Sequence, residues 1–130
     1  MKKHLIYLAI ITIACLLLVA VQRTRAEAPT ETPLTIQEYA EMRVLTEFGE
    51  GQWESFNRIV MKESRWDNLA QNPTSTAFGI FQFLNGTWQM TGYTKTSDPY
   101  LQVEAGIIYI QKRYKLPSVA LSFHNIHNYY

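Results

Sequence analysis

Apolar residues follow two different patterns along the chain. Residues 5–21 form one run without a charged side chain. Beyond it, three segments carry apolar residues at intervals of three and four, which is the spacing of one face of an α-helix. This spacing predicts helices at residues 35–48, 52–65 and 98–114. The chain beyond the first run is therefore expected to be mainly helical.

Local start signals support these helices. Thr35 and Glu38 form a capping box, in which each side chain accepts a hydrogen bond from the backbone N–H of the other residue. Asp98 precedes Pro99, a pair in which the carboxylate caps the first turn and the proline occupies its first position. A last helix, opened by a proline, is predicted over residues 117–124.

Residues 66–86 lack a helical period and are rich in Asn, Pro, Thr, Ser and Gly, so they are expected to form a loop. Within this loop, residues 79–83 (GIFQF) are expected to be extended. Alternation along such a strand would point Gln82 away from the face on which its two phenylalanine neighbours pack. A short helix is expected to begin near residue 85.

The N-terminal part of the chain has the pattern of an export signal. Residues 1–26 place basic residues before the apolar run of residues 5–21 and small residues after it, which suits signal-peptide cleavage after Ala26. The run is also just short of the ~20 residues that span a bilayer, so an uncleaved anchor in the inner membrane fits as well. Residues 27–34 are interpreted as a linker and residues 35–130 as the working domain. Both alternatives predict an exported protein of the periplasm or cell envelope.

The formal charge of the chain is +1, from 12 Lys+Arg and 11 Asp+Glu. Residues 1–26 hold four of the basic side chains and none of the acidic ones, which leaves eight against eleven and a charge of −3 beyond them. This balance excludes a surface built to bind nucleic acid phosphates. The single cysteine, Cys15, lies in the apolar run and excludes a disulfide framework. His124 and His127 have no carboxylate at a ligand spacing, so no metal and no cofactor is expected.

Glu63 is the acidic residue that the helical pattern singles out. It follows Phe56, Ile59 and Val60 by seven, four and three positions, so it shares their apolar face of the predicted helix. Partial burial raises the pKa of a carboxyl group and prepares it to donate a proton near neutral pH. The alternative is a carboxylate at the edge of that face, whose head reaches water or pairs with a neighbouring Lys or Arg.

Glu63 also opens an ordered set of short motifs. The Glu-Ser pair at Glu63 is followed by residues 72–82 (NPTSTAFGIFQ). Then come the pairs Thr87-Trp88, Tyr109-Ile110 and Arg113-Tyr114, and finally residues 120–125 (ALSFHN). In this order and spacing the set resembles the lytic transglycosylase domain of the lysozyme-like superfamily, of the soluble lytic transglycosylase type. The resemblance covers about residues 53–130. It implies a mainly α, lysozyme-like α+β fold, with a single helical domain and a small extended lobe flanking a glycan cleft.

The resemblance implies a peptidoglycan lytic transglycosylase. Glu63 would protonate the β-1,4 glycosidic oxygen between N-acetylmuramic acid (MurNAc) and N-acetylglucosamine (GlcNAc). As a carboxylate it would then take the proton of the muramoyl C6 hydroxyl, which closes on C1 and leaves a 1,6-anhydro end. Since no water is consumed, no second carboxylate is required, and Asp67 and Asp98 are poor candidates for one. The alternatives are a lysozyme-type peptidoglycan hydrolase and an inactive peptidoglycan-binding wall protein.

The same resemblance implies substrate-binding roles for Ser75, Gln82 and Tyr109. It implies a further contact from either His124 or Asn125, because the register of that region is open by one position. Considered without the resemblance, Ser75 fits a turn serine equally well, and Tyr109 fits a residue of the core.

The expected partners follow from this activity. They are the glycan strands of peptidoglycan and, if the anchor is retained, a membrane that residues 5–21 enter. The same activity fits partners in a secretion apparatus or in phage assembly. In the second case the protein would be located in the phage virion. One departure concerns the end of the sequence, where related short domains commonly have Gly-Trp-Tyr and this chain has Asn128-Tyr129-Tyr130. Asn adopts the left-handed backbone conformation nearly as readily as Gly, and Tyr provides an aromatic ring in place of Trp.

Overall fold

The computed structural model describes residues 32–130, so the predicted signal peptide or anchor lies outside the described residues. Leu34–Tyr130 forms a compact unit. Its helices are α2 (Ile36–Phe48), α3 (Trp53–Glu63), α4 (Asn85–Thr91), α5 (Pro99–Arg113) and α6 (Pro117–His127). Within the described part of the chain, no helix is both long and apolar enough to cross a membrane.

The predicted helix starts are confirmed. Thr35 and Glu38 form the capping box of α2, and Asp98 accepts hydrogen bonds from two backbone N–H groups in the first turn of α5. Helix α6 runs about one turn further than predicted, to His127, and is followed by the cap residue Asn128, whose φ of 58° is left-handed. A left-handed residue cannot continue the helix, so this asparagine sets the direction of the residues that follow it.

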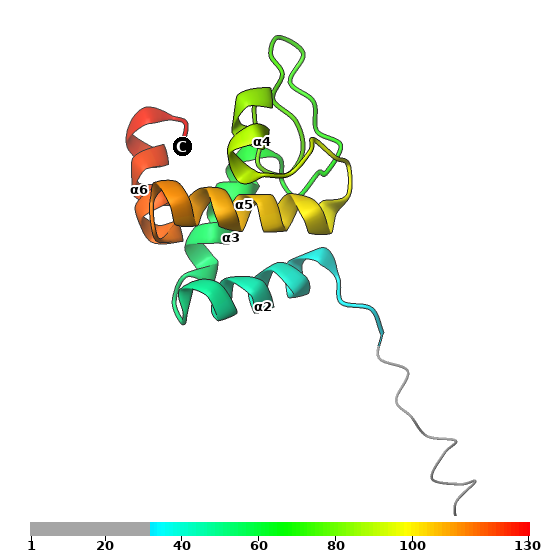
Figure 1. Cartoon of the computed structure of the whole chain (residues 1–130). Helices are drawn as coiled ribbons and strands as arrows, with labels where there is room; N and C mark the ends of the chain where they lie inside the picture. Colours follow the sequence, from blue (N-terminus) through cyan, green and yellow to red (C-terminus); the bar gives the residue numbers. More distant parts are fainter. Residues whose placement is uncertain (1–31) are drawn as a thin grey trace, which may run out of the picture. The chain divides into compact units, whose positions relative to one another are not determined.

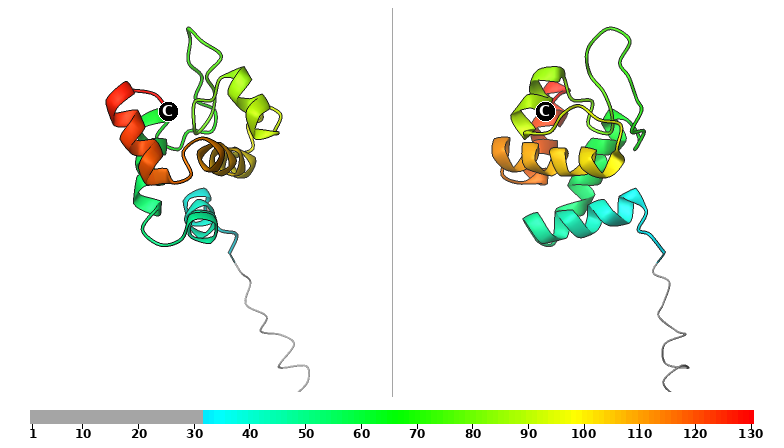
Figure 2. Two further views of the ribbon diagram at one scale, coloured as in Figure 1. Left: turned by 60° about the vertical axis from the view of Figure 1, so that its left-hand side comes forward. Right: turned by 45° about the vertical axis from the view of Figure 1, so that its right-hand side comes forward.

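The expected extended piece at residues 79–83 is wrong. Only isolated bridges form in this loop, between Gln71 and Phe78 and between Phe78 and Phe83. Gly79 and Gln82 have left-handed φ values of 79° and 51°, so the chain between the bridges is a turn. The orientation of Gln82 therefore follows from a turn and not from strand alternation. The loop before α4 projects beyond the helices (Figure 2).

Helix α5 is the centre of the helical arrangement. Helices α2 and α4 both pack against it, and α3 packs against α6. Figure 1 shows α2 and α5 side by side, with α3 running across them. The interface between these helices is apolar, and its fully buried side chains include Phe56, Ile59, Val60, Ile80 and Ile110. Burial of each such side chain stabilises the fold by about 1.5–3 kcal/mol.

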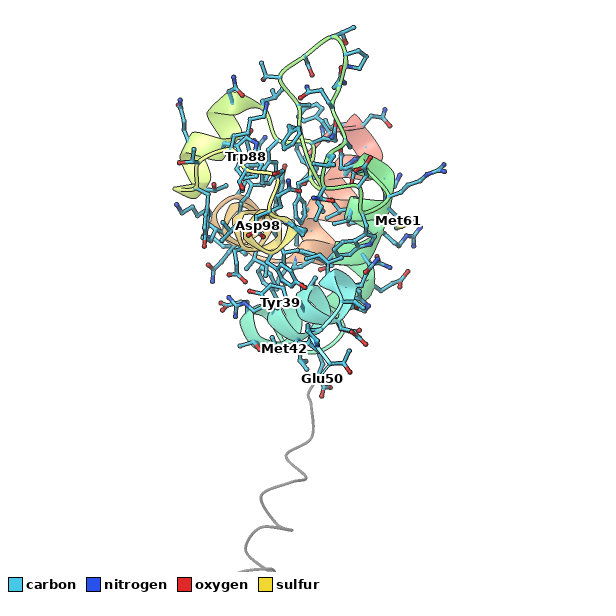
Figure 3. The ribbon with its side chains drawn as sticks, turned by 90° about the vertical axis from the view of Figure 1, so that its right-hand side faces the viewer. Tyr39, Met42, Glu50, Met61, Trp88 and Asp98 are labelled. Carbon is cyan, nitrogen blue, oxygen red and sulfur yellow. The ribbon has the colours of Figure 1, made fainter. Side chains whose placement is uncertain are left out.

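A carboxylate on α5 holds α2 in place. Glu104 accepts hydrogen bonds at Oε1 from Tyr39 Oη (2.6 Å) and Arg43 Nε (2.7 Å), and at Oε2 from Arg43 Nη2 (2.9 Å). The bidentate guanidinium lowers the pKa of Glu104. Burial and the hydrogen bond to Glu104 raise the pKa of Tyr39 to about 12. Figure 3 shows Tyr39 on the side of α2 that faces α5, and Met42 on the outer side.

One buried amide fastens the loop to α5. Gln102 is only 1% exposed. Its Oε1 accepts a hydrogen bond from the backbone N of Ile80 (2.8 Å), and its Nε2 donates to the backbone oxygens of Asn68 (2.9 Å) and Thr96 (2.7 Å). A Cβ atom at Gly79 would lie 2.6 Å from this side chain, so a glycine is required for the approach. The loop thus has a fixed position relative to α5.

Candidate active site

The described residues enclose a cavity of about 330 Å³. Its wall is formed by the end of α3, the turn after Phe78, the start of α4, the second half of α5, and the residues after α6. This is the size of a pocket that holds a small ligand or a short stretch of a polymer. Residues from four separate segments of the sequence (63, 81–87, 109–113 and 128–130) therefore meet at one place, since the turn and the start of α4 are contiguous.

Glu63, the last residue of α3, places its carboxyl group in this wall. Its side chain is 19% exposed. Burial raises the pKa of Glu63, and a hydrogen bond from His124 offsets part of that rise. Neither Lys62 nor Arg65 forms an ion pair with it, so the neighbouring-cation alternative does not describe this carboxylate.

The partner of Glu63 is His124 of α6, at 2.7 Å between Oε1 and Nε2. The other ring nitrogen of His124, Nδ1, is buried and has no hydrogen-bond partner among residues 32–130. A hydrogen on Nδ1 would be a buried donor without an acceptor, which costs about 1–3 kcal/mol. The arrangement without an unpaired buried donor has the hydrogen on Nε2, from which it is donated to Oε1 of Glu63. This leaves Oε2 as the oxygen that carries a proton when Glu63 is neutral.

The end of α3 is tied to the loop by the residue after Glu63. Ser64 Oγ donates a hydrogen bond to the backbone oxygen of Ile80 (2.8 Å). Arg65 and Trp66 then take left-handed φ values of 56° and 68°, so the chain turns sharply away from the helix. The serine of the Glu-Ser pair thus fixes the loop beside the carboxyl group.

Gln82 and Tyr109 also line the cavity. Gln82 Nε2 donates to the backbone oxygens of Ala70 and Gly79, both at 3.0 Å, which leaves the amide oxygen for an outside partner. Tyr109 is buried, and its hydroxyl donates to the backbone oxygen of Tyr130 (3.0 Å). Burial raises the pKa of Tyr109. Its ring packs in the core while its edge forms part of the cavity wall, so the two interpretations of this residue are compatible.

The sequence of the chain matches one known protein family. The family model for the transglycosylase SLT domain matches residues 45–122, more than half of the chain. The chain belongs to the transglycosylase SLT domain family. Membership confirms the resemblance noted in the sequence and the mainly helical fold, and it associates the protein with transglycosylase-type activity on peptidoglycan. Comparisons with curated proteins and with solved structures gave no significant match.

Three of the predicted substrate-binding residues, Ser75, His124 and Asn125, do not line the cavity of this SLT domain. Ser75 is exposed in the loop, and its Oγ accepts a hydrogen bond from the backbone N of Ala77 (3.2 Å). Asn125 is exposed on α6, whereas its neighbour His124 is buried against Glu63. Substrate contacts by Ser75, His124 and Asn125 stay predictions that the wall of the cavity does not support.

No second Asp or Glu side chain lies in the described wall of the cavity of the SLT domain. Asp67 is exposed and accepts a hydrogen bond from the backbone N of Leu69 (2.9 Å), and Asp98 caps α5. Among residues 32–130, no group of three or more His, Cys, Asp or Glu side chains is arranged to hold a metal ion. The chemistry available at the wall is therefore that of one carboxyl group and its histidine partner.

Sequence reasoning missed Tyr130 and Arg113 as residues of the site. Tyr130 Oη donates to the backbone oxygen of Phe81 (3.3 Å), and its ring lies 5.9 Å from the ring of His124. Burial raises the pKa of Tyr130 well above its ordinary value. The aromatic end of the sequence was a signal for Tyr130, although it lies beyond the SLT match. No periodic signal pointed to Arg113, which is exposed at the end of α5.

Proposed function

We propose that this SLT domain cleaves the β-1,4 bond between MurNAc and GlcNAc in peptidoglycan and leaves 1,6-anhydro-MurNAc ends. The observation that carries the proposal is the half-buried carboxyl group of Glu63 in the cavity wall, with no second Asp or Glu side chain among the described residues of that wall. Hydrolysis by two carboxylates requires a partner at a set distance, whereas an intramolecular displacement does not.

In the first step Glu63 acts as an acid. Its raised pKa increases the protonated fraction of the carboxyl group relative to that of a free glutamate, and His124 occupies Oε1, so the proton sits on Oε2. Oε2 donates this proton to the glycosidic oxygen as the bond between that oxygen and the muramoyl C1 breaks. The GlcNAc fragment leaves with a new hydroxyl group.

In the second step Glu63 acts as a base. The carboxylate takes the proton of the muramoyl C6 hydroxyl, and the C6 oxygen bonds to C1. Glu63 is then protonated again, and the atoms balance without water. The hydrogen bond from His124 to Oε1 stabilises the carboxylate between the two steps.

Analysis of digestion products tests this function. Purified peptidoglycan is incubated with the protein, and the released muropeptides are weighed by mass spectrometry. Products about 18 Da lighter than hydrolysis products, matching loss of one water, are expected. Full-mass products would instead support the lysozyme-type hydrolase. Binding to peptidoglycan without any product would support the inactive wall protein.

The role of Glu63 is tested with Glu63→Gln, which keeps the size and the hydrogen bond to His124 but has no proton to donate. Loss of product by at least about 100-fold is expected, in line with the usual contribution of a general acid. A circular dichroism spectrum and a thermal midpoint close to those of the unaltered protein would show that the fold is intact. Undiminished digestion would contradict the assignment of Glu63.

A further inference from the structure

The described wall of the cavity contains one cationic side chain, Arg113, at the C-terminal end of α5. Its Nη1 donates a hydrogen bond to Tyr109 Oη (2.9 Å), which uses one of its five N–H donors. No carboxylate among residues 32–130 forms an ion pair with it. The guanidinium is thus a cation with free donors beside a cavity and without an anion from the described chain.

Aromatic rings hold this guanidinium in place. Its central carbon lies 5.8 Å from the ring centroid of Tyr109, 5.4 Å from that of Tyr114 and 5.9 Å from that of Phe123. Contact with ring faces favours the cation and restricts its rotamers. A side chain held in this way loses little entropy when it binds an anion, so it is preorganised for one.

An interaction with the carboxyl group of Glu63 does not explain the position of Arg113. The interactions that lower the pKa of Glu63 come from His124, chiefly its hydrogen bond, and from Lys62, and not from Arg113. The stacking on three rings shows a packing role for the arginine stem, but packing does not use the remaining N–H donors. These donors match the two oxygens of a carboxylate.

We propose that Arg113 binds a carboxylate carried by the muramoyl unit of the glycan and so favours anionic over neutral strands. This inference rests on the proposed function in that it takes peptidoglycan as the ligand. GlcNAc is neutral, so the negative charge of a strand lies on the muramoyl lactyl group where the stem peptide has been removed, or on the stem peptide itself. Since the chain beyond residue 26 has a charge of −3, a local cation is needed to attract such a group.

Binding measurements on the full chain carrying Glu63→Gln test the proposal without turnover. Three soluble glycan fragments of equal length are compared by calorimetry: one with stem peptides, one without stems and with free lactyl carboxylates, and one in which these carboxylates are converted to neutral methylamides. At least one anionic fragment is expected to bind about threefold to tenfold more tightly than the neutral one, the size of one partly exposed charge-assisted contact. The fragment that shows the preference identifies the source of the carboxylate.

Two substitutions added to that protein separate recognition from packing. Arg113→Gln is expected to abolish the preference and to leave the affinity for the neutral fragment unchanged, while Arg113→Lys retains part of it. Lys112→Gln is the matched control, because Lys112 is an exposed cation on the same helix that donates to the backbone oxygen of Met90 and lies outside the cavity wall. It is expected to keep the preference.

Equal affinity for all three fragments would overturn the proposal, and so would a preference that survives Arg113→Gln. Weaker binding of the neutral fragment by Arg113→Gln, without a change in the preference, would assign Arg113 to packing alone and overturn it as well. The binding result does not depend on cleavage. If the unaltered protein releases no anhydro product but the preference is found, the proposed function fails and the carboxylate site stands.

Discussion

Glu63 experiences two opposing effects, and their balance decides its protonation. Burial raises its pKa because a low-dielectric environment disfavours the charged form. The hydrogen bond from His124 lowers it, since the donated hydrogen favours the carboxylate. An acid that must release and then recover a proton needs both forms within reach, which this balance supplies.

Substitution of His124 should change the pH dependence of activity. His124→Phe removes the hydrogen bond that lowers the pKa of Glu63, so the pKa rises and Glu63 stays protonated to higher pH. The alkaline fall of kcat/KM is expected to move to higher pH. The rate at the optimum is expected to fall about tenfold, because the proton is no longer confined to Oε2. Rates of muropeptide release between about pH 4 and pH 9 measure both effects.

His124→Gln is the matched control for this experiment, because its amide nitrogen reaches approximately the position of Nε2. It is expected to keep the alkaline fall close to that of the unaltered protein. Identical profiles for the Phe and Gln variants would show that His124 acts only by filling space.

The apolar face of α3 predicted the inward direction of Glu63, since neighbours on one helix face are fixed by local geometry. Its partner His124 lies 61 positions away and was found only through the fold. The sequence left His124 and Asn125 as equal alternatives, because a register error of one position cannot be detected without packing. Arg113 stood in the motif set without a role at the site, and its contacts with three rings from two regions were found only through the fold.

At the level of elements, the contact between α2 and α5 depends on the charge of Glu104. Its pKa is lowered by Arg43. A carboxyl group with a lowered folded-state pKa stabilises the fold at pH values above its ordinary pKa of 4.5, and this stabilisation is lost as the pH falls through the folded-state value. The attachment of α2 should therefore weaken in acid.

Glu104→Gln tests this dependence. At pH 7 the variant is expected to be less stable by on the order of 1 kcal/mol, because one partly exposed charge pair is lost. This corresponds to a fall of about 4–8 °C in the thermal midpoint of a domain of this size. Near pH 3 the two proteins are expected to differ little. A difference that is the same at both pH values would contradict a charge-dependent contact.

The packing of the loop on α5 depends on the absence of a side chain at Gly106. A Cβ atom there would lie 2.2 Å from Cζ of Phe81, whose ring belongs to both the core and the cavity wall. Gly106→Ala is expected to destabilise the fold by about 1–3 kcal/mol through overpacking, despite the higher helix propensity of alanine. Urea denaturation measures the change, and release of product is expected to fall as well.

Gly86→Ala provides the matched control, since a Cβ atom at Gly86 of α4 has no neighbour within 4 Å. This variant is expected to be as stable as the unaltered protein or slightly more so. Equal losses from both substitutions would argue against a packing explanation at Gly106.

The helices were predictable because caps and apolar periods act over a few residues. The loop was not, because its path depends on left-handed residues and on Gln102, whose partners lie 6, 22 and 34 positions away. Gln82 illustrates the difference. Its neighbours are both buried, as an alternating strand would require, yet they belong to a turn.

At the scale of the whole molecule, the chain divides its charge between two parts. The four basic side chains of residues 1–26 flank the apolar run, and the net negative part follows it. We propose that this arrangement exports residues 27–130 to the peptidoglycan, as a free or membrane-anchored protein. Mass spectrometry of the protein recovered from an expressing bacterium distinguishes the two forms. Cleavage predicts a chain that begins at Glu27 and is found in the soluble envelope fraction. Anchoring predicts a full-length chain in the membrane fraction.

The hydrogen bonds between the Gln102 amide and the backbone affect the range of pH over which the site keeps its geometry. Glu104 and Glu63 both change protonation in acid, but an amide does not titrate, and its three hydrogen bonds to the backbone are the same at any pH that the fold survives. Acidification of the surroundings would therefore protonate the carboxyl group of Glu63 without breaking the hydrogen bonds between Gln102 and the loop beside it. The protonation of Glu63 thus depends on pH, whereas the hydrogen bonds of Gln102 that hold the loop to α5 do not.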